Sequence, residues 1–227
     1  MKTVHVTDNL IQLDRAHFVN AYLVREPDGF TLVDTTLGGA ADDLIAAARS
    51  AGGEIRRIAL THGHLDHAGS LDALKARLGD GVEVLEGDLD ARIHAGEQVV
   101  EGKLRGSWPK HLTTRPDVRL VGGERIGSLE VVPTPGHTPG HMAFLDTRDR
   151  SLIAGDTFTT YWRAEVPNRL LQPFPLAAMG TQDREQVVNS ARALRRLEPT
   201  TLVIGHGPAV RSPAAAMDAA ISRASRG

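Results

Sequence analysis

Alternation of apolar and polar positions predicts that the first third of the chain is rich in β-strands. Residues 1–6 alternate in this way, and residues 20–25 and 30–34 are two largely apolar runs. The intervening residues 27–29 read Pro-Asp-Gly, a turn tripeptide in which proline fixes φ and glycine permits a positive φ. The two runs are therefore predicted to pair as an antiparallel β-hairpin.

Helical periodicity appears later in the chain and alternates with short apolar runs. Leu71, Leu74 and Leu78 recur at helical spacing, and the segment 181–197 carries an apolar stripe at the same period. Alanine-rich stretches give two further helices. Strands are predicted at residues 55–60, 82–85, 118–121, 128–132, 142–145, 151–154 and 201–204, and helices at residues 39–51, 68–78, 181–197 and 213–223.

Two segments follow neither period. Residues 87–116 contain several glycines and are expected to leave the core as an excursion that contributes to a substrate wall. Residues 158–180 hold four aromatic residues and three prolines. They form either a loop that covers the substrate or a satellite core under a long loop.

Composition restricts the partners of the protein. The 227 residues suit one domain spanning 1–227, and the net charge of −2 provides no global attraction for nucleic acid or an anionic membrane. No run of 18 apolar residues and no signal-peptide block is present. We therefore expect a cytoplasmic protein with a small-molecule substrate, without nucleic-acid or membrane partners. The sequence leaves open whether it forms a homodimer.

The densest chemical signal lies in residues 61–67, between a predicted strand and a predicted helix. His62, His64, Asp66 and His67 offer three imidazoles and a carboxylate, which are suitable ligands for zinc or a similar transition ion. His62 and His64 share a direction in an extended turn, whereas Asp66 and His67 point elsewhere. Two ligand pairs with two directions indicate two metals. The alternative is a solvent-exposed loop that is merely rich in histidine.

Three further candidates each lie beside a predicted strand. His137 is held in a loop stiffened by prolines and glycines, Asp156 follows an apolar strand, and His206 lies between two glycines after another strand. A carboxylate at a strand end can bridge two ions with its two oxygens, so Asp156 is the bridging candidate. Because the chain has no cysteine, any metal must be bound by histidine and carboxylate side chains.

Other polar residues have roles that the sequence leaves open. Asp34 either braces its own turn or supports the metal ligands, and His141 is a second metal-facing group, a supporting residue or a plain strand-end histidine. His94 and His111 are interpreted as surface or packing histidines. The roles of Tyr161, Trp162 and Arg163 also stay open, although an Arg163 guanidinium facing the pocket would indicate an anionic substrate.

These residues in this order resemble the metallo-β-lactamase superfamily, in its binuclear hydrolase form and its glyoxalase-II-like or lactonase-like branch. The resemblance rests on Asp34, the His-x-His-x-Asp-His block at 62–67, His137, Asp156 and His206. It implies an α/β fold, a four-layer αβ/βα sandwich of two mixed β-sheets with helices on the outside.

The resemblance also implies a ligand assignment. His62, His64 and His137 would bind one metal, Asp66, His67 and His206 the other, and Asp156 would bridge them. The cofactor would be Zn²⁺, two per chain, with iron or manganese as alternatives. A hydroxide bridging the ions would be the nucleophile, and solvent or Asp66 would protonate the leaving group.

The family carries several reactions, so the fold does not select the substrate. Our expectation is hydrolysis of a small ester, thioester or lactone. The alternatives are a mononuclear iron oxygenase resembling persulfide dioxygenases, a phosphodiesterase or nuclease on the same scaffold, and a catalytically idle metal-binding module. Hydrolysis of β-lactams is not expected. The true β-lactamases that this chain resembles lack an aspartate at the position of Asp156 or use a cysteine ligand, whereas this chain has Asp156 and no cysteine.

Overall fold

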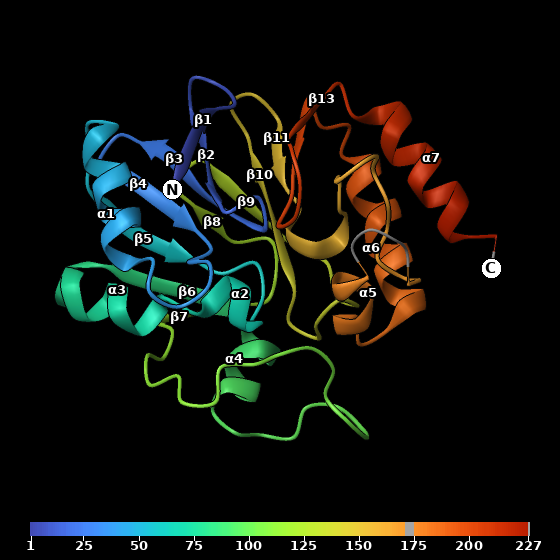
Figure 1. The fold of residues 1–227 in the computed structure, drawn as a ribbon, viewed down its shortest axis with the longest axis horizontal. Helices are drawn as coiled ribbons and strands as arrows, with labels where there is room; N and C mark the ends of the chain where they lie inside the picture. The colour runs from blue at the N-terminus through green and yellow to red at the C-terminus, as the bar shows by residue number, and fades with distance from the viewer. Residues whose placement is uncertain (171–174, 227) are drawn as a thin grey trace.

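Two β-sheets lie face to face between two layers of helices (Figure 1). The computed structural model describes residues 1–170 and 175–226. Within these residues the first sheet has seven strands in chain order: β1 (Lys2–His5), β2 (Leu10–Arg15), β3 (Val19–Glu26), β4 (Gly29–Val33), β5 (Ile55–Ala59), β6 (Glu83–Gly87) and β7 (Val118–Leu120). The predicted hairpin is confirmed by the antiparallel pairing of β3 with β4.

The second sheet is built from the later part of the chain. In the part of the chain that the structure describes, it has six strands in the order β13 (Val210–Arg211), β12 (Thr201–Val203), β11 (Ser151–Ile153), β10 (Met142–Asp146), β9 (Leu129–Pro133) and β8 (Arg125–Ile126). β4 to β7 are parallel within the first sheet, β11 and β12 are parallel within the second, and the other pairs are antiparallel. Both sheets are mixed, which confirms the predicted fold class.

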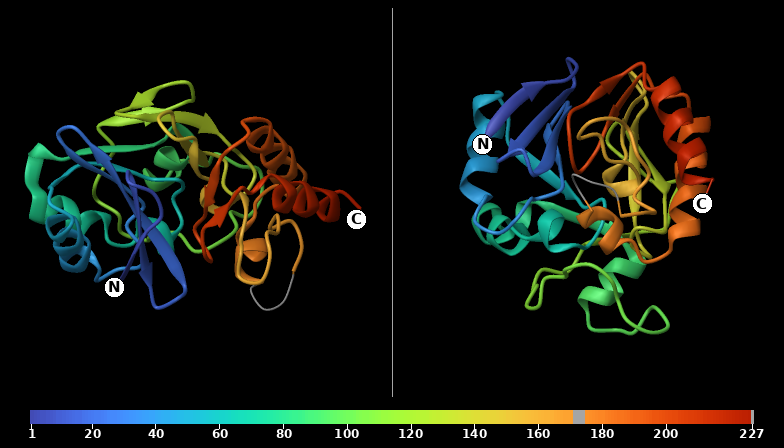
Figure 2. Two further views of the ribbon diagram at one scale, coloured as in Figure 1. Left: turned by 90° about the horizontal axis from the view of Figure 1, so that it is seen from above. Right: turned by 45° about the vertical axis from the view of Figure 1, so that its right-hand side comes forward.

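Helices cover the outer face of each sheet. The first sheet is covered by α1 (Ala41–Ser50) and α3 (Leu71–Leu78), and the second by α6 (Arg184–Arg196) and α7 (Ala214–Ala224) (Figures 1 and 2). The short helices α2 (Leu65–Ala68), α4 (Asp88–His94) and α5 (Leu176–Gly180) and the 3₁₀ turns Gly79–Gly81 and Gly155–Thr157 lie in the connections. No helix among residues 1–170 and 175–226 is long and apolar enough to cross a membrane.

The core consists of three clusters of apolar side chains, because side chains alternate between the two faces of each strand. Leu32 packs toward α1 and α3, whereas its neighbour Val33 faces the second sheet. In the second sheet Leu152 packs toward α6 and α7, and Ile153 faces the first sheet. Since successive side chains of a strand point to opposite faces, consecutive apolar residues can fill two different cores. Strands buried on both faces therefore appear as continuous apolar runs in the sequence.

One predicted helix is interrupted in the structure. The segment 68–78 was expected to be a single helix, but α2 ends at Ala68 and α3 begins at Leu71. Gly69 lies so close to other backbone that a β-carbon there would come within 2.4 Å of the Leu65 carbonyl oxygen. Its N–H group donates to the Thr36 carbonyl at 2.9 Å, outside the helix. This tertiary contact redirects the chain and ends α2.

The irregular segments contain short helices that the sequence pattern did not indicate. α4 lies within 87–116, and α5 lies within 158–180. Phe158, Ala164 and Val166 belong to the core under α6 and α7, which confirms the satellite-core alternative for these residues. Phe174 and its neighbours 171–173 lie outside the described residues.

The predicted helix at 181–197 begins later, at Arg184, because Asp183 caps it. The Asp183 carboxylate accepts hydrogen bonds from the backbone N–H groups of Glu185 and Gln186, at 3.0 and 2.9 Å. An aspartate at this position satisfies backbone donors that have no partner within the helix. The cap fixes where α6 starts.

Polar side chains of β3 join the two sheets at one edge. The Tyr22 hydroxyl donates to the Ile204 carbonyl at 2.7 Å and accepts from the Ile204 N–H at 3.2 Å. Asn20 donates to the carbonyl oxygens of Ile204 and Gly207 (3.0 and 2.8 Å). These contacts fix the segment that carries His206 against the first sheet.

Candidate metal centre

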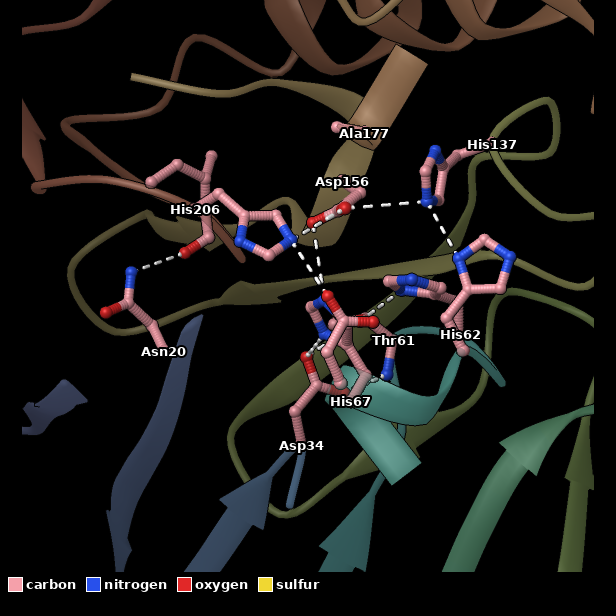
Figure 3. A network of polar contacts seen from close by, with 12 residues as sticks. Asn20, Asp34, Thr61, His62, His67, His137, Asp156, Ala177 and His206 are labelled. Carbon is pink, nitrogen blue, oxygen red and sulfur yellow. Dashed lines mark hydrogen bonds and ion pairs between the residues drawn. The ribbon is translucent and has the colours of Figure 1, made fainter. Parts of the chain in front are cut away.

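All seven candidate ligands lie close together in the structure. Figure 3 labels His62, His67, His137, Asp156 and His206 among them. Each is carried by a loop or short helix that follows or precedes a strand. His62 and His64 follow β5, Asp66 and His67 lie in α2, His137 lies between β9 and β10, Asp156 follows β11, and His206 follows β12. The structure thus brings together segments that are up to 144 positions apart in the sequence.

Three groups of donor atoms have the spacing of metal sites. In each group the potential ligand atoms lie within 4.8 Å of one another. The groups are His62, His64 and His137; His62, His67 and Asp156; and Asp66, His67 and His206. The first and third correspond to the two triads expected from the resemblance, and the second connects them.

Asp156 lies between the two triads. Its Oδ2 is 3.4 Å from His137 Nε2 and 3.2 Å from His206 Nε2, and its Oδ1 is 3.5 Å from His67 Nε2. One carboxylate therefore faces imidazoles of both triads. Gly205 makes this approach possible, because a β-carbon there would come within 2.1 Å of Asp156 Oδ1.

Hydrogen bonds fix the ring tautomers of the inner histidines. The Asp34 carboxylate accepts from the Thr61 N–H (2.7 Å) and hydroxyl (2.8 Å) and from His67 Nδ1 (2.8 Å). Because the Thr61 hydroxyl donates to Asp34, it accepts from His62 Nδ1 at 3.0 Å. His62 and His67 thereby keep their protons on Nδ1 and present Nε2 to the centre. Asp34 thus supports two candidate ligands, because its carboxylate accepts from Thr61 and His67 and not from its own turn.

The outer histidines are oriented in the same way. His206 Nδ1 donates to the Phe18 carbonyl at 2.6 Å, and His137 Nδ1 lies 3.0 Å from the Thr181 hydroxyl, which itself donates to backbone carbonyls. His64 has the opposite tautomer, because its Nε2 lies 3.3 Å from the Arg105 carbonyl. His64 Nδ1 therefore faces the centre, 3.1 Å from His137 Nε2.

Some of the inward-facing atoms have no hydrogen-bond partner. Among the described residues, His62 Nε2, His67 Nε2 and Asp156 Oδ1 are buried without one. A buried polar atom without a partner costs about 1–3 kcal/mol, so a cluster of them needs a compensating ligand. Imidazole nitrogens and a carboxylate at this spacing suit a transition-metal cation. The donor set fits the metal cofactor expected from the sequence.

The electrostatics divide the histidines into two groups. Burial lowers the pKa of His62 and His137 well below the usual range, so both rings are neutral, as a ligand must be. Burial also opposes protonation of His67, but Asp34, Asp156 and Asp66 outweigh it and raise its pKa to about 9. In the metal-free chain the proton on His67 therefore partly balances the carboxylates. A bound cation would replace that charge.

His141 supports the centre without facing it. Its Nε2 accepts the backbone N–H of Asp156 at 3.0 Å, and its Nδ1 lies 2.8 Å from the Thr134 hydroxyl. Both ring nitrogens are therefore engaged, and burial lowers the pKa of His141 to about 3. Of the three alternatives for His141, the structure favours a supporting residue that positions Asp156.

Helix α4 contains two supporting residues: Asp90, which the sequence analysis did not single out, and His94, which it interpreted as a surface or packing histidine. Asp90 accepts hydrogen bonds from the Gly63 N–H (2.9 Å), the Thr138 hydroxyl (2.6 Å) and the Gly140 N–H (2.7 Å). His94 lies one turn later, and its Nε2 donates to the Gly63 carbonyl at 2.9 Å. Both backbone groups of the residue between His62 and His64 are therefore held by one helix.

His94 is buried, and it is not a simple packing residue. Its Nδ1 lies 2.8 Å from the buried Glu86 carboxylate. Burial alone would lower the pKa of His94, but the contact with Glu86 raises it. The Asp-x-x-x-His spacing in residues 90–94 was the available signal, because residues four apart share a helix face. His111, by contrast, is exposed.

A cavity of about 430 Å³ opens over the centre. His64, Asp66, His137, Asp156 and His206 form its polar floor. Gly106 and Ser107 of the excursion line its walls, as expected for residues 87–116, together with Leu176, Ala177, Met179 and Gly180 of α5. Trp162 is 83% exposed and Arg163 pairs with Glu165, and neither lines this cavity.

Comparisons with known proteins agree with this geometry. The uncharacterized protein YobT of Bacillus subtilis (strain 168) is 40% identical over 214 residues, which cover 92% of this chain and 91% of that protein. A hydroxyacylglutathione hydrolase of Rhodospirillum rubrum is 30% identical over 152 residues, 67% of this chain and 48% of that enzyme. The chain therefore matches about half of the length of that enzyme.

A solved structure has a similar fold, and a family description matches most of the chain. The crystal structure of TTHA1623 in a di-iron-bound form superposes with a TM-score of 0.66 at 28% identity, covering 88% of this chain and 93% of that chain. Residues 14–206 match the family described as the metallo-beta-lactamase superfamily. This range contains all seven candidate ligands together with Asp34, His141 and the α4 residues. The chain belongs to the metallo-β-lactamase superfamily.

Proposed function

We propose that this protein is a binuclear metal-dependent hydrolase that cleaves a small ester, thioester or lactone. The observation that carries the proposal is the position of Asp156, whose two carboxylate oxygens face the rings of both triads. A group in that position can share its charge between two cations, whereas a mononuclear site needs only one triad. We assign Zn²⁺ as the cation, because nitrogen and carboxylate donors without cysteine suit it.

The di-iron-bound form of TTHA1623 supports two metal positions in a protein similar to this one. It also keeps iron as an alternative to zinc. Two bound cations would supply a water deprotonated near neutral pH and a Lewis acid for the substrate carbonyl. The assignment to one metal over the other therefore depends on direct metal analysis.

The chain itself contributes charge and orientation. Burial would raise the pKa of Asp66, but His67 and His206 lower it far below its usual range, so the carboxylate is ionised. Asp66 is partly accessible from the cavity, with its Oδ2 at 3.4 Å from His206 Nε2. An ionised carboxylate at the cavity floor can serve as a metal ligand and as a hydrogen-bond acceptor that orients the attacking water. The Asp34 carboxylate keeps the His67 ring in place by accepting a hydrogen bond from its Nδ1.

A phosphodiester substrate is less well supported. Two metal ions could bind the reacting phosphate, but a nucleic-acid backbone also needs lysine or arginine contacts, and no lysine or arginine lines the cavity among the described residues. We therefore propose an uncharged carbonyl compound as the reacting group, with no nucleic-acid or membrane partner.

The proposal is tested with a panel of chromogenic esters, thioesters and lactones and with bis(p-nitrophenyl) phosphate. The purified protein is measured as isolated, after removal of metal by a chelator, and after addition of zinc. We expect acyl substrates to be cleaved, the chelator to abolish turnover and zinc to restore it. Turnover that survives complete metal removal, or cleavage of the phosphodiester alone, would contradict the proposal.

A further inference from the structure

Apolar side chains form much of the lining of the cavity over the metal centre. Six side chains form this surface: Phe18, Leu37, Leu65, Leu176, Ala177 and Met179. They come from the β2–β3 turn, the loop after β4, α2 and α5. Four separate segments thus contribute apolar atoms to one hollow.

Three of these side chains are unusually exposed for their type. Leu65 is 38% exposed, Leu176 51% and Met179 54%. Single exposed apolar residues are ordinary, but large ones gathered around a cavity mark a binding surface. A substrate that covered them would remove this apolar surface from water, which stabilises the complex in proportion to the area buried.

The charges in the cavity belong to the candidate ligands. Within the described part of the chain, its lining includes no lysine or arginine, and its only carboxylates are Asp66 and Asp156. Two divalent cations would more than balance these two carboxylates, so the charge of the loaded cavity would lie at the metal centre. The rest of the hollow therefore has no charge that could pair with a charged substrate.

Two cationic side chains lie in a neighbouring hollow. Lys103 and Arg105 line a neighbouring depression that shares Gly106 and Met179 with the cavity. That depression also contains Glu101, so its charge is mixed. An anionic leaving group of a substrate could extend into this neighbouring depression. The experiments therefore have to distinguish a substrate with such a group from an uncharged one.

We propose that the cavity binds an uncharged substrate with an unbranched hydrocarbon acyl chain. This chain lies against Leu65, Leu176 and Met179. This inference rests on the proposed hydrolase function for the position of the carbonyl, but the binding of the chain depends only on the wall. A cavity of this size accommodates an acyl chain of several carbons together with its carbonyl.

Binding is tested first, without turnover. Calorimetry compares octanamide with suberamate, which has the same chain length but ends in a carboxylate. We expect octanamide to bind at least tenfold more tightly. Equal binding, or tighter binding of suberamate, overturns the inference whatever the hydrolysis assays show.

Turnover is tested with p-nitrophenyl esters from acetate to octanoate, which share one leaving group. We expect kcat/KM to rise about two- to fourfold for each added CH₂ until the wall is covered. A flat series overturns the inference but leaves the hydrolase proposal intact. Absence of hydrolysis in every ester, with octanamide still preferred over suberamate, contradicts the hydrolase proposal and retains the apolar site.

Substitutions locate the effect. Leu176→Glu places a charge on the wall at an exposed position, so folding should be unaffected, while octanamide affinity and octanoate turnover should fall about tenfold and acetate turnover should fall less. Val121→Glu is the matched control, because Val121 is 70% exposed and lies outside the cavity. An equal loss in both variants, or no loss in Leu176→Glu, would overturn the placement of the chain.

The leaving-group side is examined with a pair of octanoyl thioesters, one of a neutral thiol and one of glutathione. The inference expects the neutral thioester to be cleaved with the higher kcat/KM. A preference of tenfold or more for the glutathione thioester that disappears in Arg105→Gln would show recognition by the neighbouring charged depression instead, and would overturn an uncharged substrate.

Discussion

Asp90 and Gly63 are 27 positions apart in the sequence, yet the Asp90 carboxylate accepts the Gly63 N–H at 2.9 Å. Gly63 lies between two candidate ligands, His62 and His64. The same carboxylate also accepts the Gly140 N–H at 2.7 Å, from the loop that carries His137. One buried side chain outside the centre therefore fixes the relative positions of the two loops that form the first triad.

Replacement of Asp90 should weaken the first metal site. In Asp90→Asn one of the two carboxylate oxygens becomes an N–H donor that faces backbone or hydroxyl donors, so at least one hydrogen bond is lost. Loss of such supporting contacts typically lowers metal affinity by about 10- to 100-fold. We expect this loss for one of two equivalents of zinc, measured by competition with a chromophoric chelator.

Asp88→Asn is the matched control for this prediction. It lies on the same helix, is partly exposed, and contacts Arg119 at 3.4 Å. It should bind zinc like the wild type. If Asp90→Asn also binds both equivalents with unchanged affinity, Asp90 does not position the first triad.

The ionisation of Asp90 should affect stability as pH changes. Burial is the main cause that raises the pKa of Asp90 to about 6, while the carboxyl titrates near 3.8 when unfolded. A raised folded pKa stabilises the fold below the unfolded pKa, and this contribution is lost as pH rises through about 6. The difference in unfolding free energy between wild type and Asp90→Asn should therefore be largest near pH 4 and decrease up to about pH 7.

Urea unfolding of the metal-free protein, followed at several pH values, measures this difference. Other titrating groups are common to both proteins and cancel in the comparison. A difference that grows with pH between 4 and 7 would show that the carboxylate is stabilised in its ionised form instead.

Replacement of Asp66 tests the two-metal arrangement. Asp66→Ala removes a carboxylate from the second triad, and the side chain is partly accessible, so the fold should survive. The second cation should bind weakly, and turnover should fall by about 100-fold or more. Asp80→Ala removes an exposed carboxylate in the turn after α3 and should leave turnover unchanged. Full turnover in Asp66→Ala would refute the two-metal mechanism.

The convergence of the candidate ligands could be predicted from the sequence, because each candidate is carried by local structure at a strand end. His137, Asp156 and His206 all lie next to apolar strands, and strand ends that share one sheet edge come together in space. The burial of β4 on both faces could also be predicted, because the consecutive residues Leu32 and Val33 are both apolar.

The supporting contacts could not be predicted in the same way. Asp90 reaches Gly140 across 50 positions of sequence, and nothing near Asp90 indicates that partner. Likewise, the division of the helix after His67 depends on the approach of the Thr36 backbone to Gly69. The apolar wall formed by α5 depends on tertiary placement, because Leu176 and Met179 have no periodic pattern beyond one short turn.

The metal content of the protein, purified without added metal and measured by mass spectrometry against protein concentration, tests the central claim most directly. Two triads that share Asp156 should hold about two equivalents of transition metal per chain, with zinc as the expected element. A single iron per chain would indicate a mononuclear oxygenase, and a chain that binds no more than one equivalent of any metal would contradict the binuclear centre.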